Sequence, residues 1–150
     1  MPPQSSLTPL LNVEEVNRLL AEVFPQLNEK GDYFQVTDIF PGGCTVRLNA
    51  TDRHLRPGGT VSGPALFTLA DIGGYVCVLS HAGPDALSVT TNLNINFLRK
   101  AEAGPIEGHC RILKLGRSLM VFDCDMVAGP DRRTVAHATG TYSIPPRPRA

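Results

Sequence analysis

The sequence predicts an α+β domain in which one antiparallel sheet packs against a single long, buried helix. Residues 62–80, SGPALFTLADIGGYVCVLS, are almost entirely apolar and begin with residues that suit a helix start. Residues 86–100, ALSVTTNLNINFLRK, alternate between apolar and polar side chains, as in a strand with two different faces. Three further strand candidates follow with short connections, which favour antiparallel pairing. A chain of 150 residues is the size of one domain, so we expect a single domain over residues 1–150.

The N-terminal part predicts a short amphipathic helix at 12–24, NVEEVNRLLAEVF. Asn12 followed by Glu15 matches a capping box, and the apolar residues of the segment share one helical face. Pro25 ends the segment. We expect this helix to cover one edge of the domain.

A β-hairpin is predicted next. Residues 32–40 and 44–50 have strand composition, and Pro41-Gly42-Gly43 between them is a turn sequence. The segment 51–63, TDRHLRPGGTVSG, has no periodicity and is rich in glycine and polar residues, so it is predicted to be a loop.

The long apolar helix contains one carboxylate, Asp71, about two turns after a start near Gly63. Ser62 suits the N-cap, and Pro64 lies where a missing N–H does no harm. An ionised carboxylate among apolar neighbours needs a partner or a shifted pKa. Asp71 is therefore either a structural or solvent-facing residue of the helix, or a functional group.

The strand at 86–100 has one apolar and one polar face. The apolar face is predicted to hold Leu87, Val89, Thr91, Leu93, Ile95 and Phe97. The polar face is predicted to hold Ser88, Thr90, Asn92, Asn94 and Asn96. Strands are also predicted at 105–115, 118–128 and 133–144, with a turn at Gly129-Pro130-Asp131. The tail PPRPRA at 145–150 is expected to be flexible.

Composition excludes several classes of protein. The chain carries 14 Lys and Arg against 14 Asp and Glu, so no broad electrostatic field would attract nucleic acid or an acidic membrane surface. No signal peptide is recognised at the N-terminus. The four cysteines are far apart and lie in apolar segments, which indicates reduced core thiols and a cytoplasmic protein. The four histidines lack ligand spacing relative to them, so no metal site is expected.

The helix start is a second candidate for chemistry, because a free N–H there can polarise a carbonyl oxygen. Gly63 is the natural donor, since it has no side chain and Pro64 cannot donate. Gly63 and Asp71 are eight residues apart, roughly 12 Å along a helix axis. They cannot touch one carbonyl within a single chain, so a site that uses both would be shared between two subunits. Gly73-Gly74 would allow close packing, either between such helices or of the helix on the sheet.

Basic residues are concentrated at two turns. Arg99 and Lys100 end the long strand, and LKLGRS at 113–118 places Lys114 and Arg117 around a glycine-containing turn. Such groups hold phosphates, although charged strand ends are commonly only solvated.

Three segments together resemble the hotdog-fold acyl-CoA thioesterases, and within them the phenylacetyl-CoA thioesterase (PaaI-like) branch. They are RPGGTVSGPALFTLAD (56–71), VTTNLNINFLRK (89–100) with Gly104, and LKLGRSLMVFDCDM followed by TVAHATGTY. The resemblance covers about residues 33–144. It implies a hotdog fold, in which an antiparallel sheet wraps one long helix, and assembly into homodimers and homotetramers.

The resemblance also implies a site. The Gly63 N–H would polarise a thioester carbonyl, Asp71 of the facing subunit would act as nucleophile or general base, and Thr90 would help to place water. The pocket for an aryl or short- to medium-chain acyl group would be lined by Leu66, Phe67 and Tyr75. The substrate would be a thioester of coenzyme A, and no separate cofactor would be needed. The phosphates of coenzyme A would contact Arg99, Lys100, Lys114, Gly116, Arg117 and Ser118.

The loop before the helix departs from the family pattern. Arg56 and Ser62 occupy the positions of the usual Asn and His, and Pro64 occupies the position of a second glycine. Arg56 would bind a substrate anion or pair with Asp71 and silence it, and Ser62 would cap the helix or hydrogen bond at the site. Two alternatives therefore stay open: a non-catalytic acyl-CoA binding protein, and a hydratase or dehydratase that uses His54 or His81.

Overall fold

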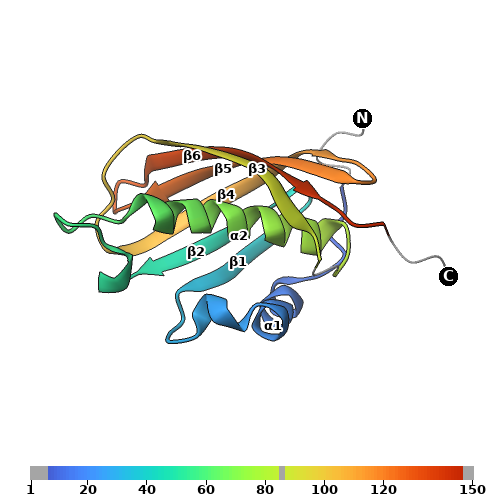
Figure 1. Cartoon of the computed structure of the whole chain (residues 1–150), viewed down its shortest axis with the longest axis horizontal. Helices are drawn as coiled ribbons and strands as arrows, with labels where there is room; N and C mark the ends of the chain where they lie inside the picture. The colour runs from blue at the N-terminus through green and yellow to red at the C-terminus, as the bar shows by residue number, and fades with distance from the viewer. Residues whose placement is uncertain (1–6, 85–86, 147–150) are drawn as a thin grey trace.

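The computed structural model describes residues 7–84 and 87–146, and its helices and strands follow the predicted order. The predicted tail at 145–150 lies outside the described residues from position 147 onward. The described chain forms one six-stranded antiparallel sheet in the order β1-β2-β4-β5-β6-β3, with a long helix, α2, against one face (Figure 1). This is the hotdog fold. The α-helices are α1 (Val13–Val23) and α2 (Gly63–His81), and the strands are β1 (Phe34–Phe40), β2 (Gly43–Ala50), β3 (Val89–Phe97), β4 (Gly104–Leu115), β5 (Leu119–Ala128) and β6 (Arg133–Ser143).

Helix α2 is the centre of the core. It starts as predicted, because Ser62 is the N-cap and its Oγ accepts a hydrogen bond from the Ala65 N–H at 3.3 Å. The helix is long and apolar enough to cross a membrane, but most of it is buried inside the protein, as in the core helix of a folded domain.

Helix α1 covers one edge of the sheet, as predicted. Its capping box is present, with Asn12 and Glu15 each accepting a hydrogen bond from the other's backbone N–H. The Asn17 side chain acts like a neighbouring strand: it donates to the Val36 carbonyl and accepts from the Val36 N–H, both at 3.0 Å. The outer edge of β1 is thereby partly protected from pairing with another chain.

Strand β3 forms the other edge of the sheet and differs from the predicted strand in one respect. Val89 and Phe97, both predicted on its apolar face, are 57% and 54% exposed. A β-bulge interrupts the pairing with β6 between Thr90 and Asn92. The bulge places Thr90 on the side that faces α2, where its hydroxyl donates to Asp71, and places Val89 on the opposite side. The predicted assignment of Thr90 to the polar face and of Val89 to the apolar face was therefore wrong.

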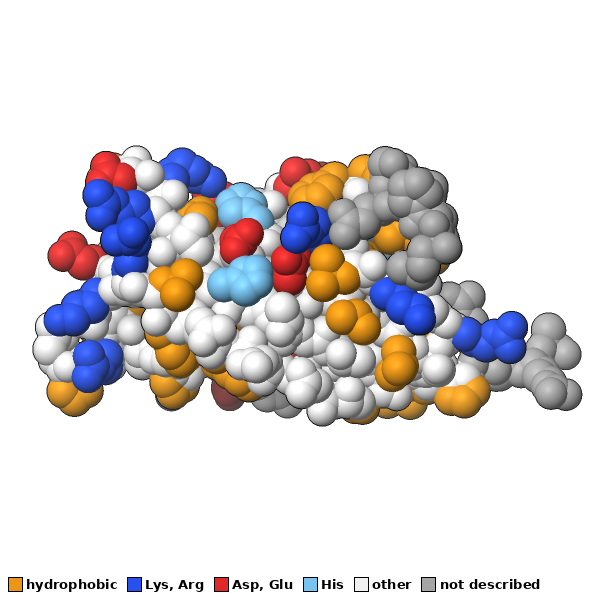
Figure 2. All heavy atoms as spheres, turned by 90° about the horizontal axis from the view of Figure 1, so that it is seen from above, with side chains coloured by type: hydrophobic (Ala, Val, Ile, Leu, Met, Phe, Trp, Pro, Cys, Tyr) orange, Lys and Arg blue, Asp and Glu red, His pale blue; other side chains and the backbone are white. Residues whose placement is uncertain are grey.

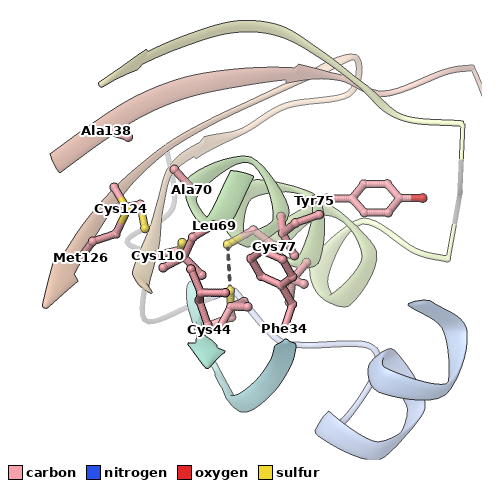
Figure 3. Close-up of a cluster of buried hydrophobic side chains, with 14 of the residues drawn as sticks. Phe34, Cys44, Leu69, Ala70, Tyr75, Cys77, Cys110, Cys124, Met126 and Ala138 are labelled. Carbon is pink, nitrogen blue, oxygen red and sulfur yellow. Dashed lines mark hydrogen bonds between the residues drawn. The ribbon is translucent and has the colours of Figure 1, made fainter. Parts of the chain in front are cut away.

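The predicted core thiols form one cluster between α2 and the sheet. All four cysteines are free and buried. Cys44, Cys110 and Cys124 are cross-strand neighbours on β2, β4 and β5. Cys77 from α2 brings its Sγ to 3.6 Å from that of Cys44, as Figure 3 shows. Burial helps to raise the pKa of each of these thiols, so they remain protonated and pack as small apolar groups.

The glycine pair of α2 permits close packing on the sheet, one of the two expected uses. A Cβ on Gly73 would lie 2.2 Å from the Cys110 Sγ, and a Cβ on Gly74 would lie 2.4 Å from the Phe122 ring. Helix and sheet therefore approach each other at these residues more closely than any side chain allows.

Gly74→Ala is expected to destabilise the fold although alanine favours helices. Replacing a helical glycine gains about 1 kcal/mol, whereas overpacking a core costs about 1–3 kcal/mol. The Phe122 and Tyr142 rings both stand in the way of the new methyl group, so we expect a net loss. Urea unfolding would measure it, with Thr68→Ala on the exposed side of α2 as control. A Gly74→Ala protein as stable as the control would contradict the packing argument.

Candidate active site

Asp71 lies where α2 faces the bulged end of β3. Its Oδ1 accepts hydrogen bonds from the Thr90 hydroxyl at 2.5 Å and from the Tyr142 hydroxyl at 2.8 Å. No ion pair to Asp71 is formed by the residues that the structure describes. Both hydroxyl groups hold the same oxygen, which leaves Oδ2 as the carboxylate atom available for chemistry.

Tyr142 was not singled out from the sequence. It is the second-last residue of β6 and is only 3% exposed, and its hydroxyl also lies 2.7 Å from the main-chain carbonyl oxygen of Asp71. Burial and the adjacent Asp71 charge raise the pKa of Tyr142 well above its ordinary value. The phenol therefore stays protonated and acts as a donor. The signal in the sequence was the alternation of TVAHATGTY, in which small residues at 136, 138 and 140 precede the tyrosine on the side that faces α2.

A pocket of 510 Å³ opens at Asp71. Tyr75, one of the predicted substrate-binding residues, lines it and extends away from the core cluster (Figure 3). Tyr75 also stacks on Tyr142, with ring centroids 6.1 Å apart. The end of α1 supplies another wall, which sequence reasoning missed because α1 is more than forty residues from Asp71 in the sequence. The lining residues from this segment are Val23, Phe24 and Gln26.

The start of α2 carries one free donor. The Ala65 N–H is capped by Ser62, the Leu66 N–H bonds to the Ser62 carbonyl, and Pro64 has no N–H. Among the hydrogen bonds of the described residues, the Gly63 N–H donates to none. Gly63 lines a second pocket, of 400 Å³, whose lining also includes four residues predicted to bind substrate or coenzyme: Arg56, Leu66, Arg99 and Lys100.

The remaining predicted site residues lie elsewhere. The Ser62 hydroxyl is used by the helix cap, and Ser62 lines a third pocket beside His54. Phe67 is 40% exposed and lines neither the Asp71 nor the Gly63 pocket. The turn that holds Lys114, Gly116, Arg117 and Ser118 is at the opposite end of the sheet from Arg99 and Lys100, because Leu119 and Val89 both pair with Ser143.

Arg56 does not silence Asp71 within one chain. It lines the Gly63 pocket together with Lys100, whereas Asp71 lies about two helical turns further along α2. The feature expected of a purely binding protein, an Arg56–Asp71 salt bridge, is therefore not formed among the described residues.

His54 and His81 are structural rather than catalytic in their surroundings. The Thr51 N–H donates to His54 Nδ1 at 2.9 Å, and the Gly42 N–H donates to His81 Nε2 at 3.1 Å. Both rings are buried, and neither lines the Asp71 pocket. A hydratase would need an imidazole beside the carboxylate, so this geometry disfavours that alternative.

Acidification is expected to destabilise the protein through these two rings. Burial lowers the pKa of both below the ordinary value of 6.5. The unfolded chain thus binds protons more readily, and stability that is full above 6.5 is lost as the pH falls below it. Urea midpoints at about pH 7.5 and about pH 5.5 would measure this loss. His81→Gln should reduce the difference between them, and an unchanged difference would exclude His81 as a cause.

Comparisons with known proteins agree with this architecture. The family model of the thioesterase superfamily matches residues 58–135. A Pseudomonas aeruginosa protein named "putative esterase" is 33% identical over 91% of this chain and 100% of its own length. A "putative thioesterase" from Silicibacter sp. has a solved structure with a TM-score of 0.84 and 45% identity, covering 93% of this chain and 96% of its own. A Ralstonia eutropha structure named "putative thioesterase, phenylacetic acid degradation-related protein" has a TM-score of 0.68 and 29% identity, covering 74% and 84%.

The chain belongs to the thioesterase superfamily. The family match and the 45% identical putative thioesterase of known structure place it among the thioester hydrolases. One of its structural neighbours is named as related to phenylacetic acid degradation.

Proposed function

We propose that this protein is a cytoplasmic acyl-CoA thioesterase that hydrolyses aryl or short- to medium-chain acyl thioesters at sites shared between two subunits. The observation that carries the proposal is the Asp71 carboxylate, held through Oδ1 by two hydroxyl donors at the wall of a 510 Å³ pocket. A carboxylate in this position can attack the thioester carbonyl or take a proton from an attacking water. If Asp71 attacks, the coenzyme A thiolate leaves and a mixed anhydride between the acyl group and Asp71 forms, which water then hydrolyses to the carboxylic acid and free Asp71. If Asp71 takes the proton of an attacking water, the water oxygen bonds to the carbonyl carbon, the thiolate leaves, and the proton passes to the thiolate.

Two subunits are needed because the oxyanion donor and the carboxylate lie in different pockets of one chain. Gly63, whose N–H is free, lines the 400 Å³ pocket, and Asp71 lines the other. An antiparallel arrangement of two α2 helices would bring Gly63 of one subunit to Asp71 of the next. The edge at β3 supports such pairing, because Val89, Phe97 and Leu98 are more than half exposed there.

The proposal is tested by free-thiol release from a panel of aryl, short-chain and medium-chain acyl-CoA thioesters. Hydrolysis of one class with the protein in an oligomeric state would support it and define the acyl group. Binding of acyl-CoA by calorimetry without thiol release would support the binding protein instead. In that case the Arg56 and Ser62 replacements would be the first cause to examine.

Tyr142→Phe is expected to lower kcat about tenfold, because it removes one of the two donors that orient Asp71 while the ring still packs. KM should change little, since the phenyl ring still lines the pocket. Steady-state kinetics of thiol release would separate the two constants. Tyr33→Phe is the matched control, because the Tyr33 hydroxyl donates to the Lys30 carbonyl outside both pockets. Equal kcat values for the two variants would remove Tyr142 from the site.

A further inference from the structure

The third pocket, of 270 Å³, lies beside the start of α2, on the side of that helix where α1 and β1 are seen in Figure 1. We call it the His54 pocket. It is formed by Tyr33, Arg53 and His54 together with Ser62, Pro64 and Thr68 at the start of α2. Within the described part of the chain, it shares no lining residue with the Gly63 pocket or the Asp71 pocket. The proposed function therefore gives it no role.

His54 supplies a hydrogen-bond donor that no protein group uses. Burial and the Arg53 charge lower the pKa of the ring, so it is neutral near pH 7. The Thr51 N–H donates to His54 Nδ1 at 2.9 Å, which places the ring proton on Nε2. His54 is only 9% exposed, yet none of the described residues accepts a hydrogen bond from Nε2. A buried donor of this kind requires an acceptor from outside the chain.

Two further donors line the same pocket. The Arg53 guanidinium lies over the Tyr33 ring, 4.6 Å from its centroid, and forms no ion pair among the described residues. The Ser62 Oγ accepts the hydrogen bond of the Ala65 N–H, which leaves the hydroxyl proton free to donate. One cation and two neutral donors therefore line one space.

These donors are not opposed by acidic groups. The described lining of the His54 pocket contains neither Asp nor Glu. The face of the sheet seen in Figure 2 differs, because Asp and Glu side chains lie there beside Lys, Arg and His. The rest of the pocket lining is mainly apolar and includes Leu27, Phe34 and Ala65. An anion with an apolar body fits this lining, and a carboxylate can accept hydrogen bonds from several donors at once.

The His54 pocket lies one helical turn before the Asp71 pocket along α2. Thr68 lines the first and Asp71 lines the second, and residues three apart lie on the same face of a helix, about 5.4 Å per turn. The segment Pro25–Asn28 borders both pockets, through Leu27 and Gln26. Thioester hydrolysis would leave an organic acid beside the Asp71 carboxylate, and two like charges repel each other. The neighbouring pocket offers that acid a cation and no opposing carboxylate.

We propose that the His54 pocket binds the carboxylate of a small apolar organic acid, with His54, Ser62 and Arg53 as the hydrogen-bond donors. Its volume of 270 Å³ is just below the range of about 300–1,000 Å³ found for drug-sized ligands, which suits an acid of the size of benzoate or hexanoate. The acid is either the product of hydrolysis at Asp71 or a separate effector, and the carboxylate chemistry is the same for both. Only the first source rests on the proposed function.

Calorimetric titration with sodium benzoate and sodium hexanoate tests the site in the absence of any thioester. Both anions should bind to the wild-type protein, and benzamide, which has no charge, should bind far more weakly. The double variant Arg53→Gln/Ser62→Gly should weaken benzoate binding about tenfold, the loss expected for a hydrogen bond to a charged group. Glycine is well tolerated as an N-cap, so the start of α2 should be preserved.

Arg18→Gln is the matched control for this variant. Arg18 is exposed on α1, forms no ion pair among the described residues, and lines none of the Asp71, Gly63 and His54 pockets. Its replacement should leave benzoate binding unchanged. Absence of binding to the wild type, or equal binding by the double variant and the control, would overturn the proposal.

The NMR resonance of the His54 Nε2–H group shows where the anion binds. Benzoate should shift this resonance in the wild type, and the loss of the signal in His54→Gln assigns it. An anion that binds without shifting the resonance occupies another site, and the proposal is then wrong.

The source of the acid follows from comparing acids with their thioesters. If the acid whose coenzyme A thioester is cleaved fastest also binds most tightly, the pocket takes the product of hydrolysis. If other acids bind as tightly, the pocket takes an effector, and both results support the carboxylate site. If no thioester is cleaved but the anions still bind, the proposed function fails and the His54 pocket stands.

Discussion

Asp71→Asn should lower kcat for acyl-CoA hydrolysis about a thousandfold, the middle of the range for removing a general acid or base. The amide keeps the shape of the side chain, and its oxygen can still accept the hydrogen bonds that Thr90 and Tyr142 donate to Oδ1. Packing of α2 on the sheet should therefore be preserved. What is lost is the charge and basicity of the second oxygen, on which either mechanism depends.

Thiol-release kinetics would measure this effect, with Asp125→Asn as the control. Asp125 is also a hydrogen-bonded carboxylate, paired with His137 at 2.6 Å, but it is 58% exposed and lines neither site pocket. Unfolding curves and the oligomeric state should match the wild type for both variants. An Asp71→Asn enzyme with substantial kcat would show that another group performs the chemistry.

The position of Asp71 was predictable from local sequence because helix α2 is specified locally. Ser62 and Pro64 fix the helix start, and the count of residues from Gly63 then places the carboxylate about two turns along. The same count correctly separates Gly63 from Asp71 within one chain. Both inferences use only the geometry of one regular element.

The surroundings of Asp71 were harder to predict because they depend on irregular and distant features. Strict alternation along 86–100 put Thr90 on the polar face of the strand, and the β-bulge after it reversed that assignment. A bulge adds one residue to a strand without a strong sequence signal. Tyr142 and the end of α1 come from the two ends of the chain, and only tertiary packing brings them to the pocket. The resemblance to thioesterases nevertheless pointed to Thr90, because it compares positions rather than strand faces.

Gly63→Pro tests the other half of the site and is expected to lower kcat/KM about a hundredfold, the loss typical of one oxyanion donor. Proline removes the Gly63 N–H, the free donor at the start of α2, and its ring fills the space in front of it. Proline is favoured at the first helical position, whereas Pro64 disfavours a helical conformation of the residue before it, so the unfolding curve of the variant has to be compared with that of the wild type. Ser62 already has an extended backbone with ψ of 153°, which is compatible with a following proline.

Gly63→Ala separates the loss of the donor from the addition of bulk. Alanine keeps the N–H, and its Cβ would lie 3.2 Å from the Phe97 ring, which is 54% exposed and has room to move. We therefore expect the alanine variant to retain most of the wild-type kcat/KM while the proline variant loses it.

Mixing Gly63→Pro subunits with Asp71→Asn subunits tests whether the donor and the carboxylate of one site come from different subunits. If each site takes its donor from one subunit and its carboxylate from the other, a mixed dimer has one intact site and regains thiol release. Two mutants that stay inactive after exchange of subunits would show that the donor and the carboxylate do not belong to a shared site.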